Sequence, residues 1–431
     1  MFDPAARCRL ARLFLLTSHF SLLTLLPTPL SAQTPDPALE QARRLLASTI
    51  LIDGHNDLPW EIRASKDAPR DVAAYDLRGR TKGMTGLPRM AEGLVGAQFW
   101  SIYVPGEIRD SGYARVQLEE FDIARRMIAR YPEKLTLALT ADDIVRAHKQ
   151  KKIASLLGLE GGHAIENSLG ALRSYYALGG RYLTLTHNVT LDWADAALDT
   201  LKHRGLTVFG REVVREMNRL GMLVDLSHVS PGVMSNVLDI AEAPVIFSHS
   251  SARALVDHRR NVPDSILARL PRNGGVVMVT FVPSFVSVAA HAGEDALDSA
   301  MAVLGATVPD TAERRRLARE YRAAHPVPNA TLRDVADHID YVRRVAGVDH
   351  VGIGSDFDGI EHGPDGLEDV STFPALFAEL IRRGWSDADL KKLAGENVLR
   401  ALRQAEATAK RLQRERPAST KTIEELDGVG S

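Results

Sequence analysis

Side chains of the types that bind metal ions follow several short apolar segments of this chain. Such segments are typical of the buried strands of a parallel sheet. Five of them end in His, Asp or Glu, at 51–57, 153–160, 223–228, 245–249 and 351–356. A single histidine after a strand is usually a loop or core residue, but five such endings favour a shared site. Because parallel strands of a β/α barrel end at one rim, we expect these side chains to converge there.

The residue types at these positions predict a metal site. His55 and Asp57 alternate on an extended segment, so both can reach one cation, and His228 and His249 follow consecutive strands. Glu160 has two oxygens that could bridge two ions. Imidazole and carboxylate ligands without thiolate suit Zn²⁺, with Mn²⁺ or Co²⁺ as alternatives. Since one ion rarely needs five ligands, we expect two ions that share a water and lower its pKa towards neutrality.

Asp356 follows the last of these segments. Its carboxylate could accept and return a proton as a general acid/base, or it could be another metal ligand. The residues alone leave both roles open.

Several motifs together resemble the membrane dipeptidase (renal dipeptidase) family of zinc metallopeptidases. They occur in the family's order over about residues 38–405, at 53–57, 158–162, 185–188, 225–230, 248–251, 259–264, 354–359 and 395–400. The resemblance implies a β/α barrel and the zinc-dependent hydrolysis of dipeptides by a hydroxide that bridges two metals. In the family's pattern His55 and Asp57 bind one zinc, His228 and His249 bind the other, and Glu160 bridges them.

The resemblance also places His187, Arg260 and Asp356 at the substrate. An imidazole at His187 could donate a hydrogen bond to the oxyanion formed at the peptide carbonyl. The planar guanidinium of Arg260 could pair with the C-terminal carboxylate of a dipeptide, and only the family pattern selects it over Arg259. Further polar residues near the motifs are expected to orient the ligands: His163, Asp225, Asp358 and His258.

Eight strand-like segments can position these residues. Three follow in addition to the five above, at 95–103, 182–186 and 275–281, and helical patterns separate most of the eight. Strands that alternate with helices predict parallel βαβ units, and eight of them suit a TIM-type (β/α)₈ barrel with the metal site at the C-terminal ends of the strands. A doubly wound open sheet is the alternative.

The expected domain organisation is a single barrel over 38–405 with an insertion at about 284–349 and a polar tail at 406–431. The insertion contains helical patterns at 310–324 and 332–345, and we expect it to lie over the barrel mouth. Together with Phe285, it could reshape the pocket. Beyond about Ala405, we expect a helix end followed by disorder.

The first 32 residues resemble a cleavable secretion signal. Arginines at 7, 9 and 12 precede an apolar stretch, 13–26, and small residues follow at 31–32. The only cysteine, Cys8, lies in this segment, so we expect a mature protein without thiols. No lipid-anchor signal is evident, and an uncleaved membrane anchor is the alternative. We therefore expect a secreted or periplasmic protein without a stable membrane anchor.

The composition indicates a soluble globular protein. The chain is 45% hydrophobic and 25% charged, with a formal net charge of −2, which gives no support for nucleic-acid binding. We expect dipeptide substrates, and a homodimer remains open. The alternatives are another amidohydrolase-type enzyme that cleaves a lactam, an ester or an N-acyl amino acid, and an exported peptide-binding protein without catalysis.

Overall fold

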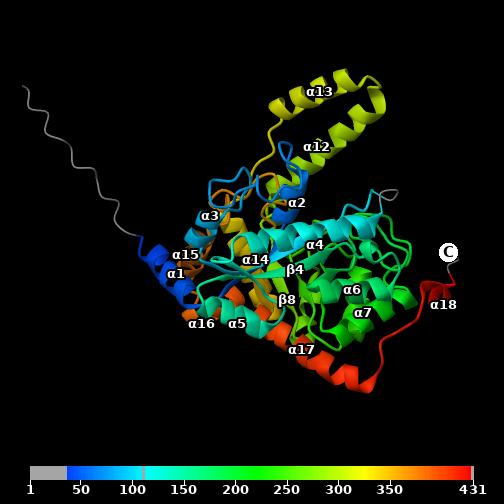
Figure 1. Cartoon of the computed structure of the whole chain (residues 1–431). Helices are drawn as coiled ribbons and strands as arrows, with labels where there is room; N and C mark the ends of the chain where they lie inside the picture. Colours follow the sequence, from blue (N-terminus) through cyan, green and yellow to red (C-terminus); the bar gives the residue numbers. More distant parts are fainter. Residues whose placement is uncertain (1–35, 109–111, 429–431) are drawn as a thin grey trace, which may run out of the picture. The chain divides into compact units, whose positions relative to one another are not determined.

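Eight parallel strands form a closed barrel in the computed structural model, which describes residues 36–108 and 112–428 (Figure 1). The barrel strands are β1 (Leu51–Asn56), β2 (Val95–Tyr103), β4 (Ile153–Glu160), β5 (Gly180–Thr184), β6 (Leu223–Asp225), β7 (Ile246–Phe247), β8 (Val276–Val279) and β9 (Val351–Ile353). They pair in the order β2-β1-β9-β8-β7-β6-β5-β4, and pairing between β2 and β4 closes the ring. The predicted TIM-type barrel is confirmed, because an open sheet would leave β2 and β4 as edges.

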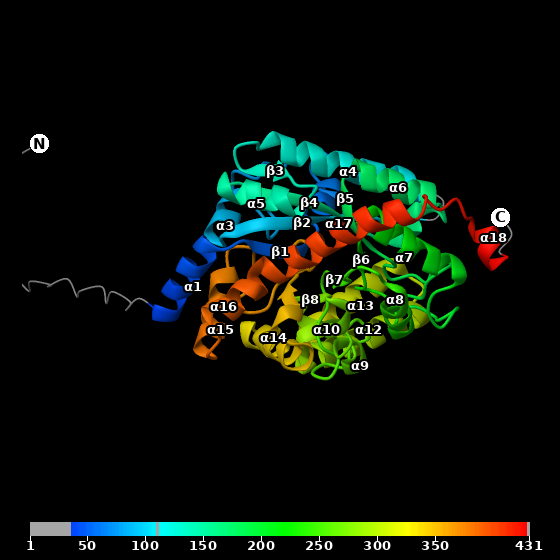
Figure 2. The same ribbon diagram turned by 90° about the horizontal axis from the view of Figure 1, so that it is seen from below.

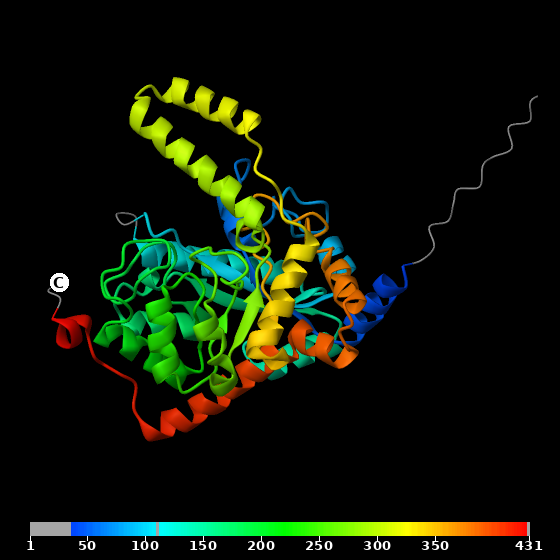
Figure 3. The ribbon, with the colours of Figure 1, turned by 180° about the vertical axis from the view of Figure 1, so that it is seen from behind.

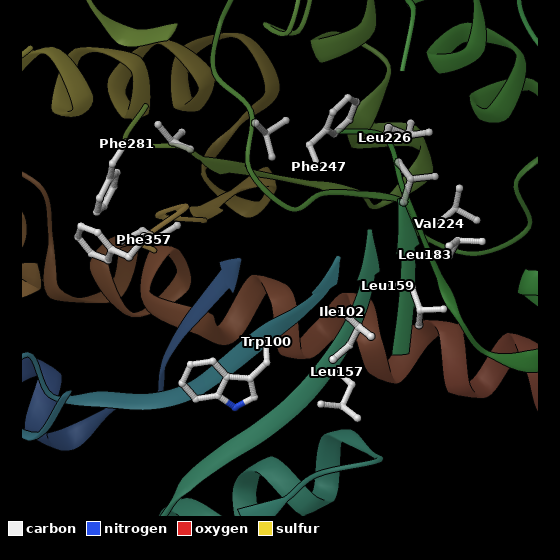
Figure 4. Close-up of a cluster of buried hydrophobic side chains, with 14 of the residues drawn as sticks. Trp100, Ile102, Leu157, Leu159, Leu183, Val224, Leu226, Phe247, Phe281 and Phe357 are labelled. Carbon is white, nitrogen blue, oxygen red and sulfur yellow. The ribbon is translucent and has the colours of Figure 1, made fainter. Parts of the chain in front are cut away.

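The alternation of side chains along the strands builds two cores. Leu157 and Leu159 of β4 belong to a large cluster that includes residues of the surrounding helices, whereas Leu156 belongs to a second cluster with Phe99 and Tyr182. Successive side chains of a strand point to opposite faces, so one set fills the barrel and the other packs under the helices. Figure 4 shows side chains of the large cluster on several strands.

Helices surround the barrel strands (Figures 1 and 3). The longer ones are α1 (Pro37–Ser48), α4 (Tyr113–Arg130), α5 (Ala141–Lys149), α6 (Leu169–Leu178), α7 (Val208–Leu220), α8 (Pro231–Ile240), α14 (Leu332–Ala346), α15 (Phe373–Arg382) and α17 (Asn397–Glu415). The short ones are α2 (Leu58–Ala64), α3 (Leu87–Glu92), α9 (Asp264–Leu267), α10 (Leu270–Asn273) and α16 (Asp387–Lys391). In the view from below, α17 crosses one end of the barrel, in contact with β8 and β9 (Figure 2).

The segment between β8 and β9 divides into an insertion and a barrel helix. After α11 (Pro283–Val286), the helices α12 (Val288–Thr307) and α13 (Thr311–Ala324) form a hairpin in which Ala290 is the only buried residue of the two. Helix α14 instead buries Val335, Ile339 and Val342 and contacts both β8 and β9. The inserted part is therefore shorter than the expected 284–349, because α14 is the ordinary helix of the last β/α unit.

Two further elements differ from expectation. The short strand β3 (Leu135–Leu137) was not predicted, and it pairs only with the first residues of β4. The segment after α17 is ordered up to residue 428, because α18 (Ile423–Asp427) buries Ile423 and the Asp427 carboxylate accepts backbone N–H groups at the start of α7. The expected helix end beyond Ala405 is present, but the disorder expected after it is not observed up to residue 428.

The predicted secretion signal, residues 1–32, lies outside the described residues. Across 36–108 and 112–428, the helices lack the combination of length and hydropathy that a membrane span requires.

Candidate active site

Three predicted ligands, all histidines, surround the carboxylate of Glu160, which is itself a predicted ligand and the last residue of β4. Its Oε2 lies 3.5 Å from Nε2 of His55. Its Oε1 lies 3.1 Å from Nε2 of His228 and 3.5 Å from Nε2 of His249. The two oxygens of one carboxylate therefore face different histidines, as a group that bridges two cations would.

Two more carboxylates lie on the His55 side of Glu160. Nε2 of His55 is 3.2 Å from Oδ2 of Asp57 and 3.9 Å from Oδ1 of Asp356. Gly359 leaves room beside them, because a Cβ at this position would lie 2.3 Å from Oδ2 of Asp57 and 2.5 Å from Oδ1 of Asp356. His55, Asp57 and Asp356 form one of three groups with the spacing of a metal site, and Glu160 belongs to the other two.

Each of the three histidines around Glu160 has an oxygen partner on its far ring nitrogen. The Nδ1 contacts are 2.9 Å from His55 to the Tyr182 hydroxyl, 3.0 Å from His228 to Oδ1 of Asn188, and 2.8 Å from His249 to Oγ of Ser248. These contacts leave Nε2 of each ring directed at Glu160. Nε2 of His55 is buried and has no hydrogen-bond partner among the described residues. Buried imidazole nitrogens and carboxylate oxygens in this arrangement fit divalent cations of the Zn²⁺ type.

The electrostatics around His55 and Glu160 favour positive charge on the His55 ring. Burial would raise the pKa of Glu160, but the charge of His55 and the hydrogen bond with His228 hold it well below its ordinary value. Burial alone would lower the pKa of His55, but Tyr182, Glu160 and Asp57 raise it well above that of a free imidazole. The surroundings that stabilise a proton on His55 would also stabilise a metal cation there.

Two candidate residues have strained backbones. His228 and Asp356 have φ angles of 68° and 67°, in the left-handed region that residues with a side chain seldom adopt. Such strain is often found where a fold holds a functional side chain in a required position.

Beside these ligands lies a cavity of about 820 Å³ whose walls include His187, Arg260 and Asp356. His187 follows β5, and its Nδ1 is buried with no hydrogen-bond partner in the described part of the chain. Burial raises the pKa of Asp356 well above its ordinary value; His55 opposes this shift and Asp57 adds to it. All three residues predicted at the substrate thus line one cavity with Glu160.

Arg260 is buried, with 1% of its surface exposed. Its guanidinium contacts Oγ of Ser250 and the carbonyl of His249 at 3.5 Å and lies 5.3 Å from the ring centre of Phe285. Within residues 36–108 and 112–428, no carboxylate lies within 4.0 Å of it. Arg259, in contrast, is exposed and does not line the cavity. The cavity therefore contains a buried cation that an anionic group of a ligand could pair with.

Three of the four residues expected to orient ligands contact the site. Asp225 accepts a hydrogen bond from Ser248, which in turn contacts His249. His258 accepts the backbone N–H of Arg260 at 3.1 Å, and its ring stacks on Phe285 at 4.2 Å.

Asp358 lines the cavity and accepts the backbone N–H of Met84 at 2.6 Å, and burial raises its pKa to about 6. His163 is different: its Nε2 contacts the carbonyl of Val104 at 2.8 Å rather than a predicted ligand.

The sequence analysis missed the side chains that contact the histidines and Glu160. They are Tyr182, Asn188 and Ser248, together with Ser101, which donates to Oε2 of Glu160 at 3.1 Å. One signal was available for Tyr182. Gly158 interrupts an apolar strand, and a Cβ there would lie 2.0 Å from the Tyr182 ring. A glycine inside a strand often marks such a close approach.

Comparisons with known proteins agree with the geometry. The sequence model of the family described as membrane dipeptidase (Peptidase family M19) matches residues 39–416. Dipeptidase 3 of Mus musculus is 41% identical over 393 residues, which are 90% of this chain and 71% of the relative. Dipeptidase 3 of Rattus norvegicus is 43% identical over 378 residues, 86% of this chain and 68% of the relative.

Two solved structures are also similar. The probable dipeptidase PvdM from Pseudomonas aeruginosa has 26% identity and a TM-score of 0.76, over 87% of this chain and 100% of that one. A metallo peptidase from Rhodobacter sphaeroides, liganded with a phosphinate mimic of the dipeptide L-Ala-D-Ala, has 25% identity and a TM-score of 0.68. That match covers 83% of this chain and 99% of the other.

Proposed function

The chain belongs to the membrane dipeptidase family, and on this basis we propose that the site around Glu160 hydrolyses dipeptides with two zinc ions. Metal-dependent hydrolysis of dipeptides follows from the family and from its structural neighbours. The number and identity of the ions, and the residues that bind them, are the finer parts of the proposal. The similarities do not favour a lactamase, an N-acyl amino acid hydrolase or a binding protein without catalysis.

The position of Glu160 is the observation that most supports two ions. Its Oε2 faces His55, and its Oε1 faces His228 and His249. In this arrangement His55 and Asp57 would hold one ion, His228 and His249 would hold the second, and Glu160 would contribute to both sites. When bound, a zinc pair polarises the peptide carbonyl and lowers the pKa of a shared water.

The cavity residues supply the contacts that orient a dipeptide. Arg260 pairs with the free C-terminal carboxylate through its planar guanidinium. This contact selects dipeptides, because a longer chain would place a peptide group at that position. His187, whose Nδ1 lacks a partner in the described part of the chain, donates a hydrogen bond to the oxygen that becomes negative during attack on the carbonyl.

Asp356 handles the proton in this proposal. It lies 3.9 Å from Nε2 of His55 and lines the cavity, so it is close to both the nucleophile and the leaving amine. Burial raises its pKa well above that of a free carboxyl group, and this shift favours a group that both accepts and returns a proton.

We also propose that the protein is exported, with residues 1–32 removed as a signal peptide, and that residues 38–405 form one catalytic domain. N-terminal sequencing of protein recovered from the periplasm or the medium tests the first part. A chain that retains residues 1–32 would contradict it.

The direct test of the function combines metal analysis with activity. Purified protein should contain close to two zinc ions per chain and hydrolyse dipeptides. A chelator should abolish turnover, and Zn²⁺, Mn²⁺ or Co²⁺ should restore it. Glu160→Gln should lower both metal content and turnover, whereas Glu133→Gln, a change at an exposed glutamate, should alter neither. Full activity in protein shown to be free of metal would overturn the proposal.

A further inference from the structure

Asp225, the last residue of β6, is fully buried and accepts four hydrogen bonds. Its Oδ1 accepts the backbone N–H groups of Ser227 at 3.1 Å and of Ser248 at 2.8 Å. Its Oδ2 accepts the hydroxyls of Thr184 at 2.5 Å and of Ser248 at 2.6 Å. Throughout the described part of the chain, no Lys, Arg or His side chain forms an ion pair with it. The direct partners of the carboxylate are thus uncharged hydrogen-bond donors.

This carboxylate fixes the direction of a hydrogen-bond chain that ends at His249. The Ser248 hydroxyl has a single proton, which is donated to Asp225. Its Oγ therefore acts as an acceptor at the 2.8 Å contact with Nδ1 of His249. The alternative acceptor for this hydroxyl proton, Oγ of Ser227, is farther away, at 3.4 Å. Nδ1 of His249 must then carry the ring proton, and in a neutral imidazole Nε2 is left with a free lone pair.

The free Nε2 points into the proposed metal site. It lies 3.5 Å from Oε1 of Glu160 and 2.9 Å from Nε2 of His228. The structure assigns to Asp225 and Ser248 a positioning role: they hold His249 in the tautomer that can bind the second metal ion. This assignment rests on the proposed function of the site and goes beyond it, because it names residues that act through a ligand.

Asp225→Asn provides the sharpest test. It reverses the donor and acceptor roles along the hydrogen bonds from residue 225 through Ser248 to His249, while the side chain keeps its shape. Oδ1 accepts two backbone N–H groups, so the amide oxygen takes that place and the amide NH₂ replaces Oδ2. The NH₂ then donates to Oγ of Ser248, whose proton turns towards Nδ1 of His249. The ring proton moves to Nε2, so metal binding there requires this hydrogen-bond arrangement to reverse. We expect Zn²⁺ affinity at the second site to fall by about 100-fold, the upper end of the range for residues that orient metal ligands.

Two further variants separate this role from general support of the fold. Ser248→Ala removes the acceptor for Nδ1 but imposes no wrong tautomer, so affinity should fall less, by about 10-fold. Thr184→Val removes a hydrogen bond from the same Asp225 carboxylate but leaves the chain to His249 intact, and its affinity should stay within about 3-fold of wild type. A purely structural role predicts the opposite order, with the isosteric Asp225→Asn as the mildest change.

The experiment uses the full-length mature protein stripped of metal. Zn²⁺ titration gives the affinity and number of sites, and ¹⁵N-histidine NMR of the metal-free protein reports which nitrogen of His249 carries the proton. The expected result is an Nδ1–H tautomer in wild type, an Nε2–H tautomer in Asp225→Asn, and selective loss of one of two zinc ions in that variant. Melting temperatures of the metal-free variants show whether each one folds.

The outcomes separate the two proposals. Wild-type protein that binds no zinc would refute the proposed function itself. Wild-type protein that binds two ions, together with an Asp225→Asn variant that binds both equally well, would refute only the role of Asp225. An Nε2–H tautomer in metal-free wild type would also refute it.

Discussion

Replacing Arg260 should separate substrate binding from stability, because this arginine is buried without an anionic partner among the described residues. Its guanidinium is 1% exposed and faces the cavity, and burial lowers its pKa to about 10. This lowering of the pKa corresponds to a destabilisation of the charged guanidinium by about 3 kcal/mol. Because the folded pKa is depressed, the destabilisation is present at all pH values below about 10.

The expected effects on stability and activity have opposite directions. Arg260→Met removes the buried charge but loses the interaction with the Phe285 ring, worth about 1 kcal/mol. The melting temperature should therefore stay the same or rise. The same variant loses two charge-assisted hydrogen bonds to the substrate carboxylate, at about 1.5–3 kcal/mol each. This loss lowers kcat/KM for a dipeptide by about 10²–10⁴-fold. Arg260→Lys retains the charge but loses the planar guanidinium that pairs with a carboxylate through two hydrogen bonds. This variant should lower kcat/KM for a dipeptide by about 10–100-fold.

The assay compares a dipeptide with its C-terminal amide. Wild type should strongly prefer the dipeptide, and both variants should lose activity only on the substrate that has a carboxylate. Arg259→Met, a change at the exposed neighbouring arginine, is the matched control and should behave as wild type. Equal losses on both substrates, accompanied by a lower melting temperature, would show that Arg260 supports the fold rather than the substrate.

Three other changes test separate parts of the structure. Asp356→Asn should retain its metals and its KM but lower kcat by roughly 10²–10⁴-fold, and loss of metal instead would make Asp356 a ligand. Tyr182→Phe removes the oxygen partner of His55 and should weaken zinc binding about 10-fold in titrations, whereas unchanged affinity would contradict this role. Glu120 is buried, 3.5 Å from Arg63, and burial raises its pKa to about 8. Because the folded pKa exceeds the unfolded one, wild type should lose up to about 5 kcal/mol of unfolding free energy between pH 4.5 and 8. Glu120→Gln should abolish that dependence in denaturant titrations.

The barrel could be predicted because most of its strands are short apolar runs, and five of the eight predicted segments end in His, Asp or Glu. Even β9, with only Val351–Ile353 in its ladder, has this pattern. Strand β3 was missed because Leu135–Leu137 is too short to stand out and pairs only with the beginning of β4. Helix α14 was assigned to the insertion from the length of the gap alone, although Val335, Ile339 and Val342 are spaced as on one face of a helix.

The candidate metal ligands could be predicted from the sequence, whereas the side chains that contact them could not. His55 and Glu160 lie at the C-terminal ends of their strands and His249 comes soon after one, so the barrel topology alone brings them to one rim. Tyr182 lies within a strand and looks like a core residue in the sequence. Its contact with His55 joins positions 127 residues apart, and only the closed barrel brings them together.

The central claim is that two metal ions lie on either side of the Glu160 carboxylate. Anomalous diffraction at the zinc edge, from crystals of protein purified without chelator in the presence of Zn²⁺, tests it most directly. We predict two peaks, one beside His55 and Asp57 and the other beside His228 and His249, with the Glu160 carboxylate between them. A single peak, or two peaks on the same side of Glu160, in crystals of active enzyme would contradict the claim.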